Sequence, residues 1–220
     1  MSAPDLLEHT PEETSDLPFP REGHSVAFVY GTLKEGFSNH WLMQELMQSG
    51  DAIRIGTART VQNYPLICGP FQVPFLLRLP GNGHRVFGEI YEVNDKAVAR
   101  LDILEGTDRG HYVRLPLSLS DLEIRDDYQM DGKHCHLREE INYDVKFTAI
   151  AYFAGMDHTP GLAMGEPIES FDARAAATYV PRRERPANKT FLEHVHAWIQ
   201  ERRSLVEATE EAYRWALPVQ

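Results

Sequence analysis

The sequence predicts a mixed α+β domain, built on a closed or strongly curled β-barrel with peripheral helices. Short runs of β-branched and aromatic residues recur along the chain between Gly and Pro breakers, which is typical of successive strands. Helical periodicity is confined to a few separate segments, in an order too irregular for a doubly wound sheet. The length of 220 residues and the hydrophobic content of 42% suffice for one large domain with a full core.

Three parts are expected along the chain. Residues 1–23 form a disordered acidic tail, since Arg21 is the one basic side chain among many acidic ones. Residues 24–180 form the barrel domain, which carries a strongly acidic insertion at 121–144. Residues 181–220 comprise a basic linker and a C-terminal amphipathic helix.

The first expected element is a strand at Val26–Tyr30, where an almost continuous apolar run indicates burial on both faces. A glycine-bounded loop follows at 31–36. Ser38 or Asn39 can then cap a helix that ends near Gln48. The order is therefore strand, loop, helix.

Further strands are expected in the middle of the chain. Four segments share β-branched or aromatic residues and are bounded by Pro or Gly: Ile53–Val61, Tyr64–Cys68, Phe75–Leu79 and Arg85–Val93. Pro80–Gly83 has the composition of a hairpin connection between the last two.

A short helix is expected next, capped by Asp95 and terminated by Gly106, where a left-handed residue belongs. Its inward-facing side chains are aliphatic: Val98, Leu101, Ile103 and Leu104. Two later strands are expected at His111–Leu119 and Val145–Phe153, and 3.6-residue periodicity resumes from Asn188. This last helix packs on its own chain or on a neighbour's, so a homodimer is one expected arrangement.

The charge balance and the cysteine content exclude several classes of protein. Asp and Glu number 33 against 22 Lys and Arg, which gives a net charge of -11 and argues against nucleic acids and anionic membranes as partners. The two cysteines, Cys68 and Cys135, are too few for a disulfide scaffold or a four-cysteine metal cage. No segment approaches the ~20 apolar residues of a membrane span. We expect a soluble, cytoplasmic protein.

Two segments are candidates for a functional site. In the loop that starts at Gly31, several backbone N–H groups are expected to point at a common anion, either a phosphate or a small carboxylate. The alternative is that Gly31 only makes a tight turn. Asp102 and Glu105 are carboxylates spaced i,i+3 among large aliphatic residues. Such neighbours exclude water and thereby raise the pKa of a carboxyl, as a general base acting on an ammonium group requires. The alternative is that Glu105 is a solvated residue at the end of the helix and that Asp102 makes only local hydrogen bonds.

Other clusters are weaker candidates. His134, Cys135 and His136 are potential metal ligands, but no second His/Cys pair at metal spacing accompanies them, so no metal site is expected. A Gly-x-Ser-x-Gly elbow is absent. One basic cluster stands in the linker, where it is either a solvated strip or a surface for an anionic partner: Arg182, Arg183, Arg185 and Lys189.

Several motifs together resemble one family. Their order and spacing carry the likeness: Phe28–Gly36, Tyr64–Leu66, Leu79–Gly83, Gly88–Tyr91, Leu101–Asp102 with Glu105, Tyr112–Arg114 and Tyr179–Arg182. They are similar to the gamma-glutamylcyclotransferase superfamily and, within it, to the gamma-glutamylamine cyclotransferase group. The likeness covers roughly residues 26–120 well, whereas the tail, the acidic insertion and the helix after Lys189 have no counterpart in compact members.

The resemblance implies a fold and an activity. The fold would be gamma-glutamylcyclotransferase-like, and the substrate a small gamma-glutamyl amine whose α-amine attacks the side-chain carbonyl, giving 5-oxoproline and a free amine without a cofactor. Glu105 would be the general acid and base. The backbone of four residues would hold the substrate: Tyr30, Gly31, Thr32 and Leu33. Tyr112, Arg114 and Tyr152 would have supporting roles.

Three alternatives remain open. Gamma-glutamyl dipeptides or glutathione could be the substrates of the same chemistry. A non-catalytic binding module could keep the fold and dock a protein through the final helix or the basic cluster. Phosphate or nucleotide binding at residues 31–36 is a third, which the net charge of -11 disfavours.

Overall fold

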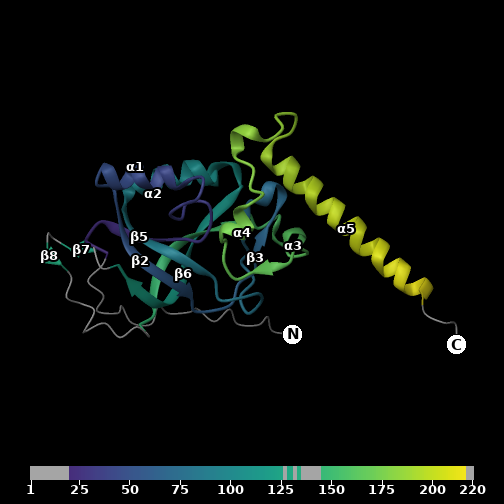
Figure 1. The fold of residues 1–220 in the computed structure, drawn as a ribbon, viewed down its shortest axis with the longest axis horizontal. Helices are drawn as coiled ribbons and strands as arrows, with labels where there is room; N and C mark the ends of the chain where they lie inside the picture. Colours follow the sequence, from purple (N-terminus) through teal and green to yellow (C-terminus); the bar gives the residue numbers. More distant parts are fainter. Residues whose placement is uncertain (1–19, 126–127, 131–132, 135–144, 217–220) are drawn as a thin grey trace, which may run out of the picture.

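The computed structural model describes residues 20–125, 128–130, 133–134 and 145–216 of the chain. Five strands close into a barrel in the order β1-β5-β2-β6-β9, so the predicted barrel is confirmed (Figure 1). The strands are β1 (His24–Val29), β2 (Ala52–Thr60), β5 (Phe87–Asn94), β6 (Tyr112–Ile124) and β9 (Phe147–Ala154).

The first strand is central, as its apolar run predicts. β1 pairs antiparallel with β5 along its whole length, and a parallel bridge between Ala27 and Ile150 joins it to β9 and closes the barrel. Val26, Ala27 and Phe28 are all at most 3% exposed. A strand with neighbours on both edges and packing on both faces needs this continuous apolar sequence.

A second, smaller sheet lies beside the barrel and overturns the predicted hairpin at residues 80–83. β4 (Pro74–Leu76) pairs with β3 (Leu66–Cys68), and β3 also pairs with β10 (Pro167–Ile168). The strand after the turn is β5, which belongs to the barrel. The turn itself exists, with Asn82 N–H donating to the Leu79 carbonyl at 3.3 Å. Local composition identified the turn, but the partners of its flanking strands depend on distant residues.

Two helices pack against the barrel: α1 (His40–Gln48) against β2 and α2 (Asp95–Glu105) against β5 (Figure 1). The cap of α2 is Asn94 rather than Asp95, because the Asn94 side chain accepts the Ala97 N–H at 3.0 Å. Gly106 terminates the helix with φ +65°, as predicted. Ile103 was wrongly predicted to face inward, since it is 69% exposed, whereas Leu101 is buried.

The acidic insertion begins within β6, a strand that extends beyond its predicted end at Leu119. β6 continues to Ile124 because Leu119 and Leu122 are fully buried, and β7 (Gln129–Met130) pairs with β8 (Lys133–His134). Residues 126–127, 131–132 and 135–144 of the insertion, which include Cys135 and His136, lie outside the described residues. So do residues 1–19 of the predicted tail, although Arg21 forms an ion pair with Glu92.

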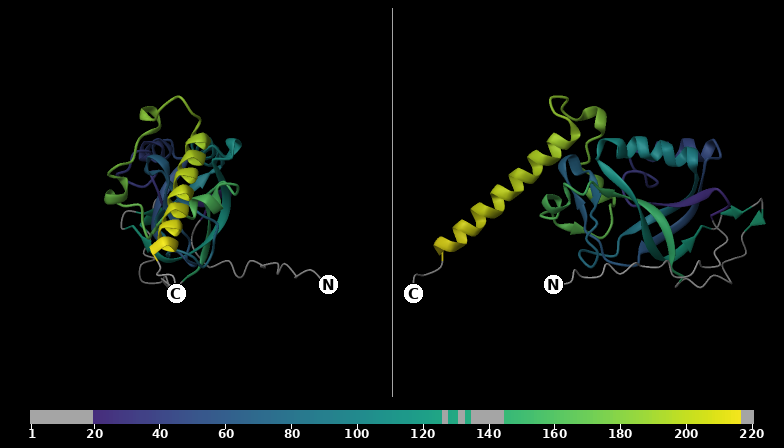
Figure 2. Two further views of the ribbon diagram at one scale, coloured as in Figure 1. Left: turned by 90° about the vertical axis from the view of Figure 1, so that its right-hand side faces the viewer. Right: turned by 180° about the vertical axis from the view of Figure 1, so that it is seen from behind.

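The C-terminal part crosses the barrel and ends in the long predicted helix. Its elements are α3 (Thr159–Leu162), β10, α4 (Ala173–Ala176), the 3-10 turn η4 (Arg182–Glu184) and α5 (Phe191–Ala216). The first turns of α5 pack against the body of the protein through the buried side chains of Val195 and Ile199. Ile199 contacts Gly161 in α3 so closely that a Cβ on Gly161 would lie 2.5 Å from the Ile199 side chain. Further along, α5 leaves the body as a rod, with Leu205 61% exposed (Figures 1 and 2). Among the described helices, none has the length and apolarity to cross a membrane.

Candidate active site

A cavity of about 710 Å³ brings both candidate segments together. It lies between the end of β1, the end of α2 and the chain that leads into α5. Every residue that was expected to bind substrate lines it, together with the expected acid and two of the three supporting residues: Tyr30, Gly31, Thr32, Leu33, Glu105, Tyr112 and Tyr152. The expected proximity of the glycine loop and the acid is therefore present, although one lies near the start of the chain and the other near its middle.

The loop after β1 is held by hydrogen bonds within residues 31–39, and it lines the cavity. Lys34 N–H donates to the Gly31 carbonyl, and Asn39 N–H donates to the Thr32 carbonyl. The Asn39 side chain also donates to the Thr32 hydroxyl, at 2.8 Å. The backbone N–H groups of Gly31, Thr32 and Leu33 have no acceptor among the described residues. Successive N–H groups without a partner at a cavity wall are available to bind an anion or a developing oxyanion.

Gly31 is needed here because of a close contact. A Cβ at Gly31 would lie 2.6 Å from the ring of Pro74, so a side chain would push the loop off β4. Two phenols strengthen this arrangement: the Tyr30 hydroxyl donates to the Tyr152 carbonyl, and the Tyr112 hydroxyl donates to the Pro74 carbonyl at 2.9 Å. The glycine thus allows the loop and β4 to approach each other at the cavity wall.

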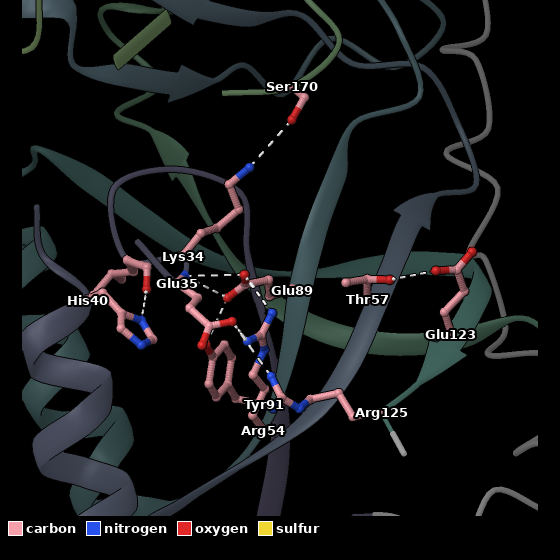
Figure 3. Close-up of polar contacts among 11 residues, drawn as sticks. Lys34, Glu35, His40, Arg54, Thr57, Glu89, Tyr91, Glu123, Arg125 and Ser170 are labelled. Atoms are coloured by element: carbon pink, nitrogen blue, oxygen red, sulfur yellow. Dashed lines mark hydrogen bonds and ion pairs between the residues drawn. The ribbon is translucent and has the colours of Figure 1, made fainter. Parts of the chain in front are cut away.

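Glu89, on β5, supports the far end of the loop (Figure 3). Its carboxylate accepts the Glu35 N–H at 3.0 Å, an Arg54 N–H at 2.8 Å and the Tyr91 hydroxyl at 2.8 Å. Arg54 also pairs with the Glu35 carboxylate, which in turn lies 3.6 Å from Arg125. The sequence analysis quoted Glu89 within a motif but gave it no role. The signal that could have found it is the presence of two acidic residues, Glu89 and Glu92, in a strand whose other residues are mostly apolar.

Glu105 ends α2 at the cavity wall. Burial raises the pKa of its carboxyl to about 8. The pKa of the Tyr30 phenol is raised by burial and then by the Glu105 charge, and the pKa values of Tyr112 and Tyr152 are raised first by burial as well. The acid is therefore surrounded by neutral phenols, and near neutral pH it can both take and give a proton.

The raised pKa has a consequence for stability. Between the ordinary pKa of 4.5 and about 8, the folded protein binds more protons than the unfolded chain, so the contribution of Glu105 to stability falls as pH rises through this window. We expect Glu105→Gln to be more stable than the parent protein at about pH 9, by a margin that shrinks toward about pH 6. Urea denaturation at both pH values checks this. A margin independent of pH would contradict the raised pKa.

Asp102 and Arg114 lie outside this cavity. Asp102 accepts the Tyr152 hydroxyl at 2.8 Å, and Arg114 lies 3.5 Å from the same carboxylate oxygen. Both line a second cavity, of about 410 Å³. Arg114 therefore reaches the main cavity only through Asp102 and Tyr152, which fits a positioning role rather than contact with substrate.

The basic cluster lines the main cavity. Arg182, Arg183, Arg185 and Lys189 all face it, with Phe191 and His194 from the start of α5. Of the weaker metal candidates, His134 lies in β8 and its two companions fall outside the described residues. The described residues contain no group of three or more His, Cys, Asp or Glu side chains that could hold a metal ion.

Comparisons with known proteins identify the family of this chain. Residues 27–166 match the family model described as gamma-glutamyl cyclotransferase, AIG2-like. A putative gamma-glutamylcyclotransferase of Arabidopsis thaliana is 39% identical over 178 residues, which cover 80% of this chain and 91% of that protein. The gamma-glutamylaminecyclotransferase of Bos taurus is 38% identical over 130 residues, which cover 49% of this chain and 77% of that protein.

A solved structure shows the same fold. The crystal structure of an AIG2-like protein from Mus musculus superposes with a TM-score of 0.59 at 31% identity, covering 74% of this chain and 99% of that one. The chain thus belongs to the gamma-glutamyl cyclotransferase, AIG2-like family, and it is an enzyme of the gamma-glutamylcyclotransferase type.

Proposed function

We propose that the protein cyclises gamma-glutamyl amines, releasing 5-oxoproline and a free amine, with Glu105 as general base and acid. The observation that carries the proposal is the common cavity of Glu105 and the glycine loop. Relatives named gamma-glutamylaminecyclotransferase support the amine as leaving group. Gamma-glutamyl-ε-lysine is the substrate that the likeness suggests first.

The chemistry is an intramolecular acyl transfer. The α-nitrogen forms a bond to the γ-carbonyl carbon, and the bond from that carbon to the amine nitrogen then breaks. Two protons leave the α-ammonium nitrogen and two reach the departing nitrogen, so no water and no net proton is consumed. A single carboxyl with a pKa of about 8 can relay both protons, because either of its forms is accessible near neutral pH.

The protein's main task is to hold the folded conformer of the substrate. Nucleophile and carbonyl belong to one molecule, and orientation of such pairs contributes up to ~7–11 kcal/mol in well-arranged systems. The N–H groups of Gly31, Thr32 and Leu33 would hold the α-carboxylate or the amide oxygen. Tyr30, fixed through Tyr152 and β4, would keep that loop in place.

A substrate panel tests the proposal. The protein is incubated with gamma-glutamyl-ε-lysine, gamma-glutamyl-alanine and glutathione, and 5-oxoproline is measured by chromatography, with Glu105→Gln as the blank. We expect 5-oxoproline from gamma-glutamyl-ε-lysine. Turnover of gamma-glutamyl-alanine or glutathione alone would reassign the leaving group within the same chemistry. No turnover of any of the three by folded protein would favour a binding module.

A further inference from the structure

One wall of the substrate cavity is a chain segment with little regular structure of its own. This wall segment, residues 179–191, runs from the turn after α4 to the start of α5 and contains only the 3-10 turn η4. It lies beyond residue 166, where the match to the family model ends. Among the described residues, one backbone hydrogen bond joins it to the barrel side of the cavity, from the Val180 N–H to the Phe71 carbonyl. Side chains must therefore hold the rest of this wall in place.

Arg185 is the centre of these side-chain contacts. Its half-buried guanidinium lies 5.5 Å from the Phe71 ring, 5.6 Å from the Tyr179 ring and 5.5 Å from the Phe191 ring. Its Nε donates to the Val180 carbonyl at 2.9 Å, and one Nη donates to the Tyr179 hydroxyl at 3.2 Å. Phe71 belongs to the loop between β3 and β4, and Phe191 is the first residue of α5. One guanidinium thus joins the loop, the wall segment and the last helix.

Phe191 extends this connection to the barrel. Its ring stacks on Phe75 of β4, with centroids 6.0 Å apart and an angle of 16° between the planes. Phe75 stacks in turn on Tyr112 of β6, at 5.3 Å and 12°. The His111 ring packs edge-on against Phe191 at 4.9 Å. Tyr112, His111 and Phe191 line the same cavity as Glu105, so these packed rings exclude water from one side of it.

Exclusion of water is what gives Glu105 its unusual acidity. Burial raises the pKa of its carboxyl to about 8. Among the described residues that line the cavity, it is the only carboxylate, and the other titratable groups come from several elements: Tyr30, Arg109, His111, Tyr112, Tyr152, Tyr179, Arg182, Arg183, Arg185, Lys189 and His194. Nearby cations lower the pKa of a carboxyl, whereas desolvation raises it. The desolvation therefore outweighs the positive charge of the wall.

We propose that Arg185 is a positioning residue, which holds residues 179–191 as a closed wall of the cavity and thereby keeps water from the Glu105 carboxyl. Arg185 acts through Tyr179 and Phe191, and the role requires no contact with substrate. The inference rests on the proposed function of Glu105 as base and acid. A wall released from its anchor would admit water, which stabilises the carboxylate and lowers its pKa.

The pH dependence of Arg185→Met tests this role. Methionine keeps an unbranched apolar stem but has neither the charge nor the donors of arginine. In the parent protein, kcat/KM for gamma-glutamyl-ε-lysine should rise with pH to a midpoint near 8, where Glu105 ionises. We expect Arg185→Met to lower this midpoint by ~1 unit, because water reaches the carboxyl. The plateau should fall by ~10-fold, mainly through KM, because the substrate is held less firmly.

The direction of this shift separates the wall from a simple charge effect. Loss of a nearby positive charge would raise the pKa of Glu105, so an upward or unchanged midpoint would overturn the inference. Arg185→Lys keeps the charge but lacks the planar fork that reaches two acceptors, and its midpoint should lie between those of the parent protein and Arg185→Met. Arg203→Met, on an exposed part of α5, is the matched control and should leave the profile unchanged. The same shift in this control would contradict a local role of Arg185.

Two measurements without turnover keep this test distinct from that of the proposed function. Trypsin should cleave after Arg182, Arg183 and Lys189 at least ~5-fold faster in Arg185→Met than in the parent protein, as mass spectrometry can follow. The stability gained at pH 9 from Glu105→Gln should also be smaller in the Arg185→Met background, because less of the raised pKa remains.

The outcomes separate the two claims. If the parent protein forms no 5-oxoproline while both measurements change as expected, the cyclisation is refuted and the anchored wall is retained. If the cleavage rate is unchanged, Arg185 does not anchor the wall. Faster cleavage with an unchanged stability gain would mean that the wall does not keep Glu105 dry. Either of the last two results refutes the inference, whatever the turnover.

Discussion

Glu105→Gln is expected to lower kcat/KM for 5-oxoproline formation by at least ~10²-fold while the fold is retained. Glutamine has nearly the same shape as glutamic acid, and the cavity favours a neutral group at this position, as the raised pKa of about 8 indicates. The amide cannot accept the proton of the α-ammonium group or return one to the departing nitrogen. The binding groups of the glycine loop remain, so the loss should appear mainly in kcat.

Asp102→Asn is the matched control for this substitution. Asp102 precedes Glu105 by one helical turn, and it lines the second cavity rather than the main one. Asparagine keeps an oxygen that can accept the Tyr152 hydroxyl but loses the charge that faces Arg114, so we expect a smaller decrease, of less than ~10-fold. Circular dichroism confirms folding of both variants, and chromatography measures 5-oxoproline. Activity of Glu105→Gln within ~5-fold of the parent protein would contradict the assigned role.

Glu89→Ala is expected to lower the free energy of unfolding by ~3–5 kcal/mol, because it leaves the buried Arg54 guanidinium without its inner partner. The side chains of the pair are 14% and 8% exposed, so water compensates little of this loss. The Glu35 N–H and the Tyr91 hydroxyl lose their acceptor as well. Since Glu35 ends the substrate loop, KM should also rise in the fraction that folds.

Glu123→Ala provides the comparison for Glu89→Ala. Glu123 is an exposed acid on β6, and its contact with Thr57 is long, at 3.4 Å. Its removal should change the free energy of unfolding by no more than ~0.5 kcal/mol. Urea denaturation of both variants gives the difference, and steady-state kinetics gives KM. A change below ~1 kcal/mol for Glu89→Ala would refute a supporting role of Glu89 in the loop.

Features that depend on neighbours in sequence were predictable. The apolar run of β1 indicated a strand buried on both faces, and Gly106 indicated the left-handed end of α2. The cap of α2 was missed by one residue, since Asn94 and Asp95 are both good capping residues and only the backbone decides between them. The pairing after residue 83 was wrong because turn chemistry does not specify which strand lies alongside.

The sequence by itself determined the five barrel strands and the three longer helices, and it identified a glycine loop and an acidic helix end as candidates for chemistry. Only the tertiary structure decided that these two segments share a cavity, that Glu89 on β5 supports the loop, and that Arg185 lines the same cavity. The physical reason is that hydrophobic periodicity and turn residues report only local conformation and whether a residue is buried, not which distant residue it contacts. Barrel closure between β1 and β9, far apart in the chain, determines which side chains face each other.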